Sequence, residues 1–315
     1  MKRIRTIFSL LMLVGLSAPS IAQETITISH TKGETTLAKY PKKVAITDLS
    51  ALETYHELGI PVAGVTDMVP AYLDVYNDKK YAKLGNAKTP DIQAIAALKP
   101  DLIIVGGRQG SHYDSLAMIA PTVIFGTDTE DFWNSFEEQI KTIASLHGKE
   151  ELAEQKLAAL RNKRTLVQAK AQNDSKKTVL AMHINGRFNP SGPESRFGFP
   201  YDVLDLKPAY IPAPEPAQPA AVSDGEAPQR ARTQAPKLAE INPDYLLVFD
   251  RNTGVKGVMP NEADIINDDV KATNAYQAGK VFILPGWIWY LAGSGLISVD
   301  QKITDIGEKL YDLKF

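Results

Sequence analysis

The sequence predicts an α/β protein of two lobes, each built on a mainly parallel sheet, joined by a single long helix. Strand and helix signals alternate up to about residue 126 and again from Val179 onward, while the residues between them carry only helical signals. Such alternation is typical of parallel sheets, so each lobe is expected to be Rossmann-like. A mature chain of about 290 residues also exceeds the comfortable size of one hydrophobic core.

One short pattern occurs twice and gives each lobe a candidate functional edge. Pro100-Asp101 and Pro243-Asp244 each open a run of four apolar residues, and an arginine stands eight residues after each proline. Short apolar runs bounded by turn signals are typical of strands that are buried on both faces. The arginines, Arg108 and Arg251, then follow the carboxyl ends of strands, where ligands bind in open parallel sheets.

The elements of the first lobe follow from local signals. Ser50 and Glu53 form a capping-box pattern that predicts a helix ending at Gly59. Thr89-Pro90 predicts the start of a second helix. The remaining predicted elements are strands over 44–46, 62–65, 102–105 and 123–125 and a helix over 111–120.

A long helical stretch separates the two lobes. From Thr129 to about Ala171 only helical composition is present, interrupted at Gly148. Apolar residues at helical spacing after Lys149 predict a helix that joins the lobes, although a surface helix of one domain fits the same pattern equally well. The predicted boundaries are a signal peptide at 1–22, an N-terminal lobe at 23–147, a linking helix at 148–172 and a C-terminal lobe at 173–315.

The second lobe contains strands over 179–182, 245–248 and 281–284 and two irregular stretches. Residues 185–198 are dense in turn residues and directly follow a strand, so they are expected at the strand-end edge. Residues 208–236 are rich in proline and alanine and can bury little surface, which predicts an extended or mobile segment.

The first residues indicate export. Lys2, Arg3 and Arg5 precede the apolar run 7–16, and Ser20-Ile21-Ala22 offers a cleavage site. The run is shorter than the roughly 20 residues that span a bilayer, so we expect a periplasmic protein that is not membrane-spanning. The chain has no cysteine, which excludes disulfides, thiolate metal sites and a lipid-modified cysteine.

The charge of the mature chain argues against nucleic acid as a partner. Removal of the signal peptide leaves 32 of the 35 Lys and Arg residues against 37 Asp and Glu, a formal charge of about −5. Known enzyme signatures are missing from the sequence, including the Gly-x-Ser-x-Gly elbow and the phosphate loop. The five histidines have no ligand spacing.

Three arginines, Arg108, Arg196 and Arg251, fall at predicted strand ends or in the adjacent loop. Arginine is permanently charged, forks its donors toward oxyanions and stacks on aromatic faces. A cluster of three predicts a planar, aromatic, multiply anionic ligand.

A second edge feature is the aromatic run that includes Trp287, Trp289 and Tyr290, directly after the strand 281–284. It fits a cleft wall that stacks on ligand rings, and it fits an aromatic cluster that caps the core equally well. In the first case Tyr290 offers a hard oxygen ligand for a ferric ion.

Four ordered motifs resemble those of the periplasmic iron-siderophore binding proteins of ABC transporters, in the catecholate-binding branch. They are Gly107-Arg108-Gln109, Ser195-Arg196-Phe197-Gly198, Asp250-Arg251-Asn252 and Trp289-Tyr290-Leu291. The resemblance implies a class III periplasmic binding protein with a helical backbone, a non-enzymatic and monomeric carrier without a cofactor of its own. Its partners would be a ferric siderophore and an inner-membrane ABC permease.

The resemblance also implies residue roles. Arg108, Arg196 and Arg251 would face the chelate together with Trp289, and Tyr290 would be the iron ligand. Glu53 and Asp202 would dock on permease arginines. Relatives that bind tetradentate siderophores pair the tyrosine with a histidine from a loop before the second Pro-Asp strand, but no histidine follows His183 here. Three interpretations stay open: the ligand fills all six iron sites, the pairing is incomplete, or this loop has been altered.

Two other classes of function stay open on the sequence alone. The chain could carry heme, a corrinoid or a metal ion. It could also be a secreted α/β enzyme that uses Tyr290, Asp250 and an arginine on an anionic substrate.

Overall fold

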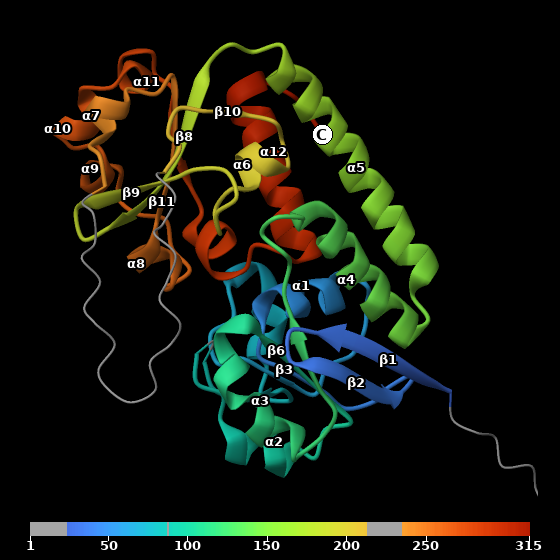
Figure 1. The fold of residues 1–315 in the computed structure, drawn as a ribbon. Helices are drawn as coiled ribbons and strands as arrows, with labels where there is room; N and C mark the ends of the chain where they lie inside the picture. The colour runs from blue at the N-terminus through green and yellow to red at the C-terminus, as the bar shows by residue number, and fades with distance from the viewer. Residues whose placement is uncertain (1–23, 87, 213–234) are drawn as a thin grey trace, which may run out of the picture.

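The computed structural model describes residues 24–86, 88–212 and 235–315. Two lobes, lower and upper in Figure 1, are joined by the helix α5 (Glu150–Gln172), which runs along one side of the molecule. The predicted signal peptide and most of the proline- and alanine-rich stretch lie outside the described residues.

The lower lobe is a five-stranded parallel sheet of order β5-β4-β3-β6-β7, flanked by short helices, with an antiparallel hairpin of β1 and β2 beside it. The strands are β1 (Thr25–His30), β2 (Gly33–Ala38), β3 (Val44–Ile46), β4 (Gly64–Val65), β5 (Ala82–Lys83), β6 (Leu102–Gly106) and β7 (Thr122–Phe125). The helices are α1 (Leu49–Glu57), η1 (Ala71–Asn77), α2 (Ile92–Leu98), η2 (Gly107–His112) and α3 (Tyr113–Ala117).

The upper lobe repeats this plan with the parallel strand order β10-β8-β11-β12, to which β9 adds an antiparallel strand beside β8. The strands are β8 (Lys177–Ile184), β9 (Arg187–Ser191), β10 (Lys207–Pro208), β11 (Tyr245–Asp250) and β12 (Val281–Leu284). The helices are α6 (Phe199–Asp202), α7 (Leu238–Ile241), α8 (Arg251–Gly254), α9 (Glu262–Ile265), α10 (Asp268–Lys271), α11 (Asn274–Gln277), η3 (Trp287–Leu291) and α12 (Leu296–Tyr311).

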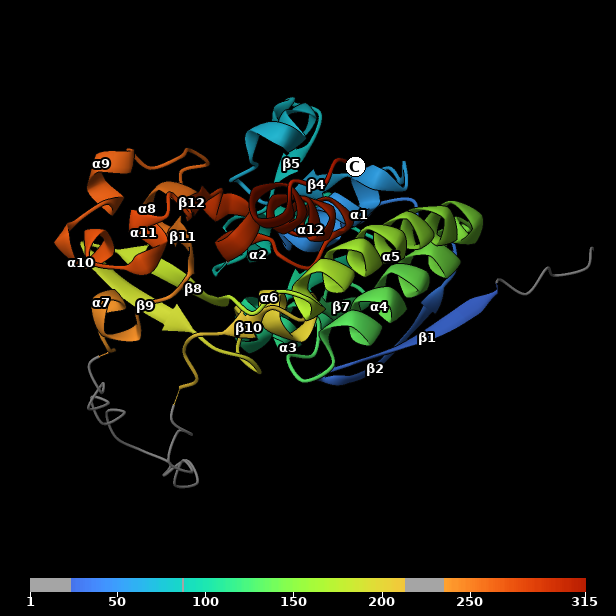
Figure 2. The ribbon, with the colours of Figure 1, turned by 90° about the horizontal axis from the view of Figure 1, so that it is seen from above.

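Three long helices connect the lobes. Viewed from above, α4 (Phe132–His147) and α12 lie beside α5 (Figure 2). Lys156 of α5 pairs with Glu57 of α1 at 2.5 Å, and Lys163 pairs with Asp300 of α12 at 2.6 Å. Because these helices contribute to both lobes, one continuous buried core runs from the lower sheet to the upper one.

The repeated Pro-Asp pattern has the same structural role in both lobes. Asp101 accepts the backbone N–H of Lys43 at the start of β3, and Asp244 accepts that of Lys177 at the start of β8. In each lobe the aspartate thus fixes the entry of the neighbouring parallel strand. The break at Gly148, which has a φ of 64°, and the predicted strands are confirmed, except that the strand predicted over 62–65 covers only Gly64–Val65.

The predicted helix starts at Ser50 and at Thr89-Pro90 are wrong by one or two residues, and the predicted helix over 111–120 is instead the end of the 3-10 turn η2 followed by the shorter helix α3. The side chain of Asp48, not Ser50, caps α1 by accepting the N–H of Ala51. Asp91, not Thr89, caps α2. Asp48 closely follows β3 and Asp91 directly precedes α2, and the cap by Asp48 leaves Ser50 and Glu53 free for other contacts. The predicted lobe boundaries stay a prediction, since α12 packs on α1 as well as on α5.

Candidate functional site

The three predicted arginines come together between the lobes, although they lie far apart in the sequence. Arg108 belongs to η2 in the lower lobe, directly after β6, while Arg196 and Arg251 belong to the upper lobe. Gln109 fixes the turn η2 that carries Arg108. Its side-chain oxygen accepts a hydrogen bond from the Thr47 hydroxyl at 2.6 Å, and its side-chain nitrogen donates to the carbonyl of Asn86 at 3.0 Å.

Tyr290 is the point on which all three guanidinium groups converge. Arg108 and Arg196 donate to its backbone carbonyl oxygen at 2.9 and 2.8 Å. Arg251 donates through Nε to its phenol oxygen at 3.0 Å. The three guanidinium carbons lie 4.9 to 5.5 Å from the centre of the Tyr290 ring. The sequence therefore predicted a real cluster, built from both lobes.

The cluster carries excess positive charge. In the described part of the chain, none of the three arginines has a carboxylate oxygen within 4.0 Å. Burial lowers the pKa of Arg196, and the neighbouring charge of Arg108 lowers it further. Like charges held together in a partly buried site favour the binding of an anion that neutralises them.

The same charges act on the phenol. Burial by itself would raise the pKa of Tyr290, but the Arg251 hydrogen bond and the three guanidinium charges outweigh it and hold the pKa below its usual value. A phenol that loses its proton more easily is a better ligand for a hard cation such as a ferric ion.

A buried pair behind Arg251 fixes its position. Asp250 accepts the Thr253 N–H at 2.7 Å as the cap of α8, and its other oxygen bonds the His183 ring at 2.7 Å. A Cβ on Gly254 would lie only 2.7 Å from the carbonyl carbon of Gly286, so this glycine allows α8 to approach the turn before Tyr290 closely. This packing brings Arg251 to the phenol.

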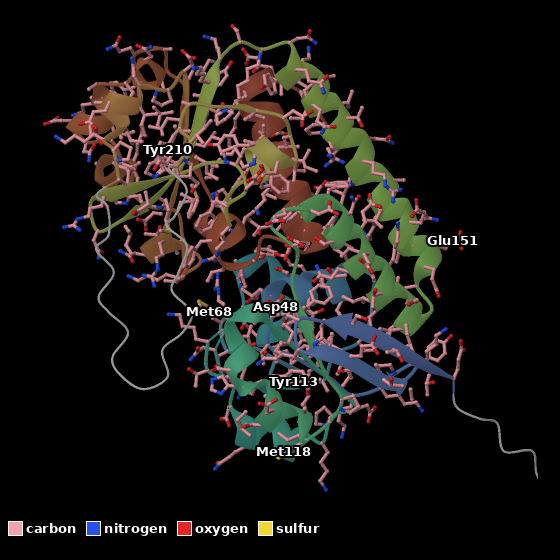
Figure 3. The ribbon with its side chains drawn as sticks, viewed as in Figure 1. Asp48, Met68, Tyr113, Met118, Glu151 and Tyr210 are labelled. Atoms are coloured by element: carbon pink, nitrogen blue, oxygen red, sulfur yellow. The ribbon has the colours of Figure 1, made fainter. Side chains whose placement is uncertain are left out.

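A cleft with a volume of about 250 Å³ is lined from both lobes and is bordered by Arg108, Arg196 and Tyr290, whereas Arg251 bonds the Tyr290 phenol from outside the cleft lining. Asp48, labelled in Figure 3, lines it from the lower lobe near the junction with the upper one. Asp202 lines it from the upper lobe, and its carboxylate accepts the N–H of Glu194 at 3.0 Å. Asp202 thereby fixes the loop that carries Arg196. Its predicted permease contact stays a prediction.

Trp289 is positioned differently from the predicted stacking wall. It borders the cleft but is only 3% exposed, and its ring N–H donates to Asp305 of α12 at 3.0 Å. Its ring packs edge-on against Phe199, with 6.2 Å between ring centres. Trp289 therefore offers little surface to a ligand and acts mainly in packing.

Glu53 does not fit the predicted docking role in this structure, because its carboxylate has no exposed surface. It accepts the hydroxyl of Tyr72 at 2.5 Å and the N–H of Ser298 at 2.9 Å. Burial raises the pKa of Glu53 to about 7. A Cβ on Gly295 would lie 2.3 Å from its Oε2, so glycine is required where α12 meets α1. Glu53 holds the lobes together instead.

Residues of α12 also belong to the site, although the sequence did not predict them there. Lys302 lines the cleft and is buried, on the same helix face as Val299 and Ile306. A lysine on the apolar stripe of an amphipathic helix was the available signal. Among the residues described, no group of three or more His, Cys, Asp or Glu side chains could hold a metal ion, and no helix is long and apolar enough to cross a membrane.

Fold and site together define a two-lobed binding protein with a cationic cleft between its lobes. The chain matches the periplasmic binding protein family over residues 44–286 and belongs to that family.

Its relatives include proteins with siderophores in their names. The petrobactin-binding protein YclQ of Bacillus subtilis is 34% identical, with 91% of this chain and 89% of the relative covered. The ferric-anguibactin-binding protein FatB of Vibrio anguillarum is 32% identical, with 95% and 94% covered. The crystal structure of the periplasmic catecholate-siderophore binding protein VctP of Vibrio cholerae has a TM-score of 0.78 at 29% identity, over 90% of this chain and 99% of that one. The resemblance stated from the motifs is confirmed.

Proposed function

We propose that this protein captures a ferric catecholate-type siderophore in the periplasm and delivers it to an inner-membrane ABC permease. The observation that carries the proposal is the convergence of Arg108, Arg196 and Arg251 on Tyr290 without a carboxylate partner within 4.0 Å among the described residues. The names of the relatives support the same class of cargo.

The site suits this cargo for physical reasons. A ferric tris-catecholate complex carries three negative charges spread over aromatic rings, which matches three guanidinium groups around an aromatic side chain. Partial burial strengthens these pairs relative to surface ion pairs while leaving the complex reversible. The residues hold and release the chelate and carry out no chemistry on it, so the protein is a carrier rather than an enzyme.

Tyr290 is the residue through which the protein would touch the iron. Its lowered pKa favours direct coordination when the siderophore leaves a site open. No described histidine joins it in the cleft lining, so a siderophore that fills six sites by itself would be held by charge and packing alone.

The test is a titration of tryptophan fluorescence with ferric catecholate chelates beside their iron-free forms. Trp289 borders the cleft and Trp287 lies on the same turn η3, so saturable quenching by the ferric forms alone is expected. Arg251→Ala should weaken binding about tenfold to hundredfold, because it removes charge-assisted hydrogen bonds, and should leave the melting temperature nearly unchanged.

Arg187→Ala is the matched control, since Arg187 is exposed on β9 and carries the same charge, whereas Arg251 bonds the Tyr290 phenol. Equal affinities of the Arg251 variant and the wild type would remove the charge argument. A folded wild-type protein that responds to no ferric chelate would refute the proposed cargo.

A further inference from the structure

Lys302 is a buried amine that borders the cleft and has no carboxylate partner among the described residues. Only 6% of the residue is exposed, and the described residues offer its Nζ one hydrogen-bond acceptor, the Gly293 carbonyl oxygen at 2.9 Å. No described carboxylate oxygen lies within 4.0 Å of Nζ. An ammonium group has three N–H donors, and leaving donors unsatisfied in a buried site costs free energy.

Aromatic rings surround this amine. Nζ lies 4.8 Å from the ring centre of Phe199, 5.3 Å from that of Trp289 and 5.9 Å from that of Phe132. Ring faces stabilise a cation, but they do not take up its N–H donors as an oxygen does. The environment therefore tolerates a charged amine and leaves room for an oxygen acceptor.

The charges that face the amine come from several elements. Burial lowers the pKa of Lys302 to about 7, the Arg196 guanidinium acts in the same direction, and Glu53 of α1 opposes both. Asp202 of α6 also lines the cleft, and Asp305, which lies on α12 like Lys302, accepts the Trp289 ring N–H. The amine is thus close to half protonated near neutral pH, and an added anion would shift it to the charged form.

The amine and the arginine cluster occupy different positions in one cleft. The guanidinium groups gather around Tyr290, whereas Nζ lies against the ring of Trp289, the preceding residue. A ligand that fills the cleft can therefore meet two separate cationic positions.

We propose that Lys302 forms a second anion-binding position, which takes a carboxylate on the part of the siderophore that does not chelate iron. The inference rests on the proposed function that the cargo is a ferric chelate. A localised carboxylate supplies both the missing acceptor and the missing counter-charge, which a neutral amide or hydroxyl does not. Lys302 would then select carboxylate-bearing chelates among those that the arginines accept.

Two matched probes test this selection: the ferric complex of bis(2,3-dihydroxybenzoyl)lysine, which has one free carboxylate, and that of the corresponding carboxamide. We expect the wild type to bind the carboxylate form about tenfold to hundredfold more tightly at pH 6.5. Because only the charged amine gives this advantage, it should decline as the pH rises above about 7.

Lys302→Met should abolish both the advantage and its pH dependence, and Lys302→Arg should retain part of the advantage. Lys309→Met, on the same helix but outside the cleft lining, is the control with the same loss of charge. Retention of the advantage in Lys302→Met would overturn the inference, as would equal binding of both probes by the wild type. Binding of neither probe would instead refute the proposed function on which the inference rests.

Calorimetry on the wild type gives a measurement that does not depend on folding of a variant. In two buffers of different ionisation enthalpy at pH 7, the carboxylate probe should take up as much as about half a proton more than the carboxamide. Any proton released by Tyr290 is common to both probes and cancels in this comparison. Equal proton uptake by the two probes would overturn the inference.

Discussion

Glu53→Gln tests the buried contact between α1 and α12 through its dependence on pH. In the folded protein burial raises the pKa of Glu53 from 4.5 to about 7. The folded state then holds the proton more tightly than the unfolded state, so the free energy of unfolding of the wild type falls as the pH rises from 4.5 to about 7. Each tenfold change in proton affinity is worth about 1.4 kcal/mol, so the total loss is about 3 kcal/mol.

Glutamine cannot ionise, so the Glu53→Gln variant does not lose this free energy of unfolding as the pH rises. We expect the wild type to gain about 3 kcal/mol relative to Glu53→Gln when the pH is lowered from 8 to 4.5, on top of a constant offset for the altered hydrogen bonds to Tyr72 and Ser298. Urea unfolding of both proteins over this range measures the difference. Glu57→Gln on the same helix, where a half-buried glutamate pairs with Lys156, is the control. A wild-type-to-variant difference that stays constant with pH would refute the argument.

Three further changes probe the surroundings of the cleft. Gly295→Ala should destabilise the protein by about 1–3 kcal/mol in urea unfolding, because the new Cβ would lie 2.4 Å from a carbonyl oxygen of α1; unchanged stability would contradict this close packing. Trp289→Phe should cost about 1–3 kcal/mol of stability through the lost bond to Asp305 while ferric-chelate quenching persists through Trp287; loss of all quenching would contradict the packing role. Asp202→Asn should weaken chelate binding about fivefold in the fluorescence titration, because the loop that carries Arg196 loses a charge-assisted hydrogen bond. An unchanged affinity would show that the Asp202 carboxylate does not position Arg196 for binding.

The arginine cluster could be predicted because it depends on a general property of parallel sheets. Arg108 and Arg251 follow strands that the sequence marks clearly, and the carboxyl ends of such strands face the ligand edge in each lobe. Neither Pro-Asp pattern indicates that the arginines would meet at the backbone carbonyl of Tyr290. The aromatic run placed Tyr290 at the edge, and only the packing of both lobes brings the three groups together.

The contacts of α12 could not be predicted from local patterns. Ser50 and Glu53 match a capping box, but Asp48 already caps the helix, so the glutamate is free to accept the N–H of Ser298 in the other lobe. The spacing within one helix cannot reveal a partner so distant in the chain. The sequence left two roles open for Trp289 for the same reason, since the carboxylate that accepts its ring N–H lies on α12.

The three arginines converge on Tyr290 and have no carboxylate oxygen within 4.0 Å among the described residues, so an anionic chelate would neutralise their positive charges when it binds. The lobes are tied by α5 and by the buried contacts at the start of α12, and continuous helices leave few hinge positions for a large rotation. A bound trianion would therefore change the electrostatic potential at the mouth of the cleft far more than it changes the outline of the molecule. Occupancy should then be visible as a shift in ion-exchange retention, and a permease that distinguishes full from empty carriers would have to sense charge rather than shape.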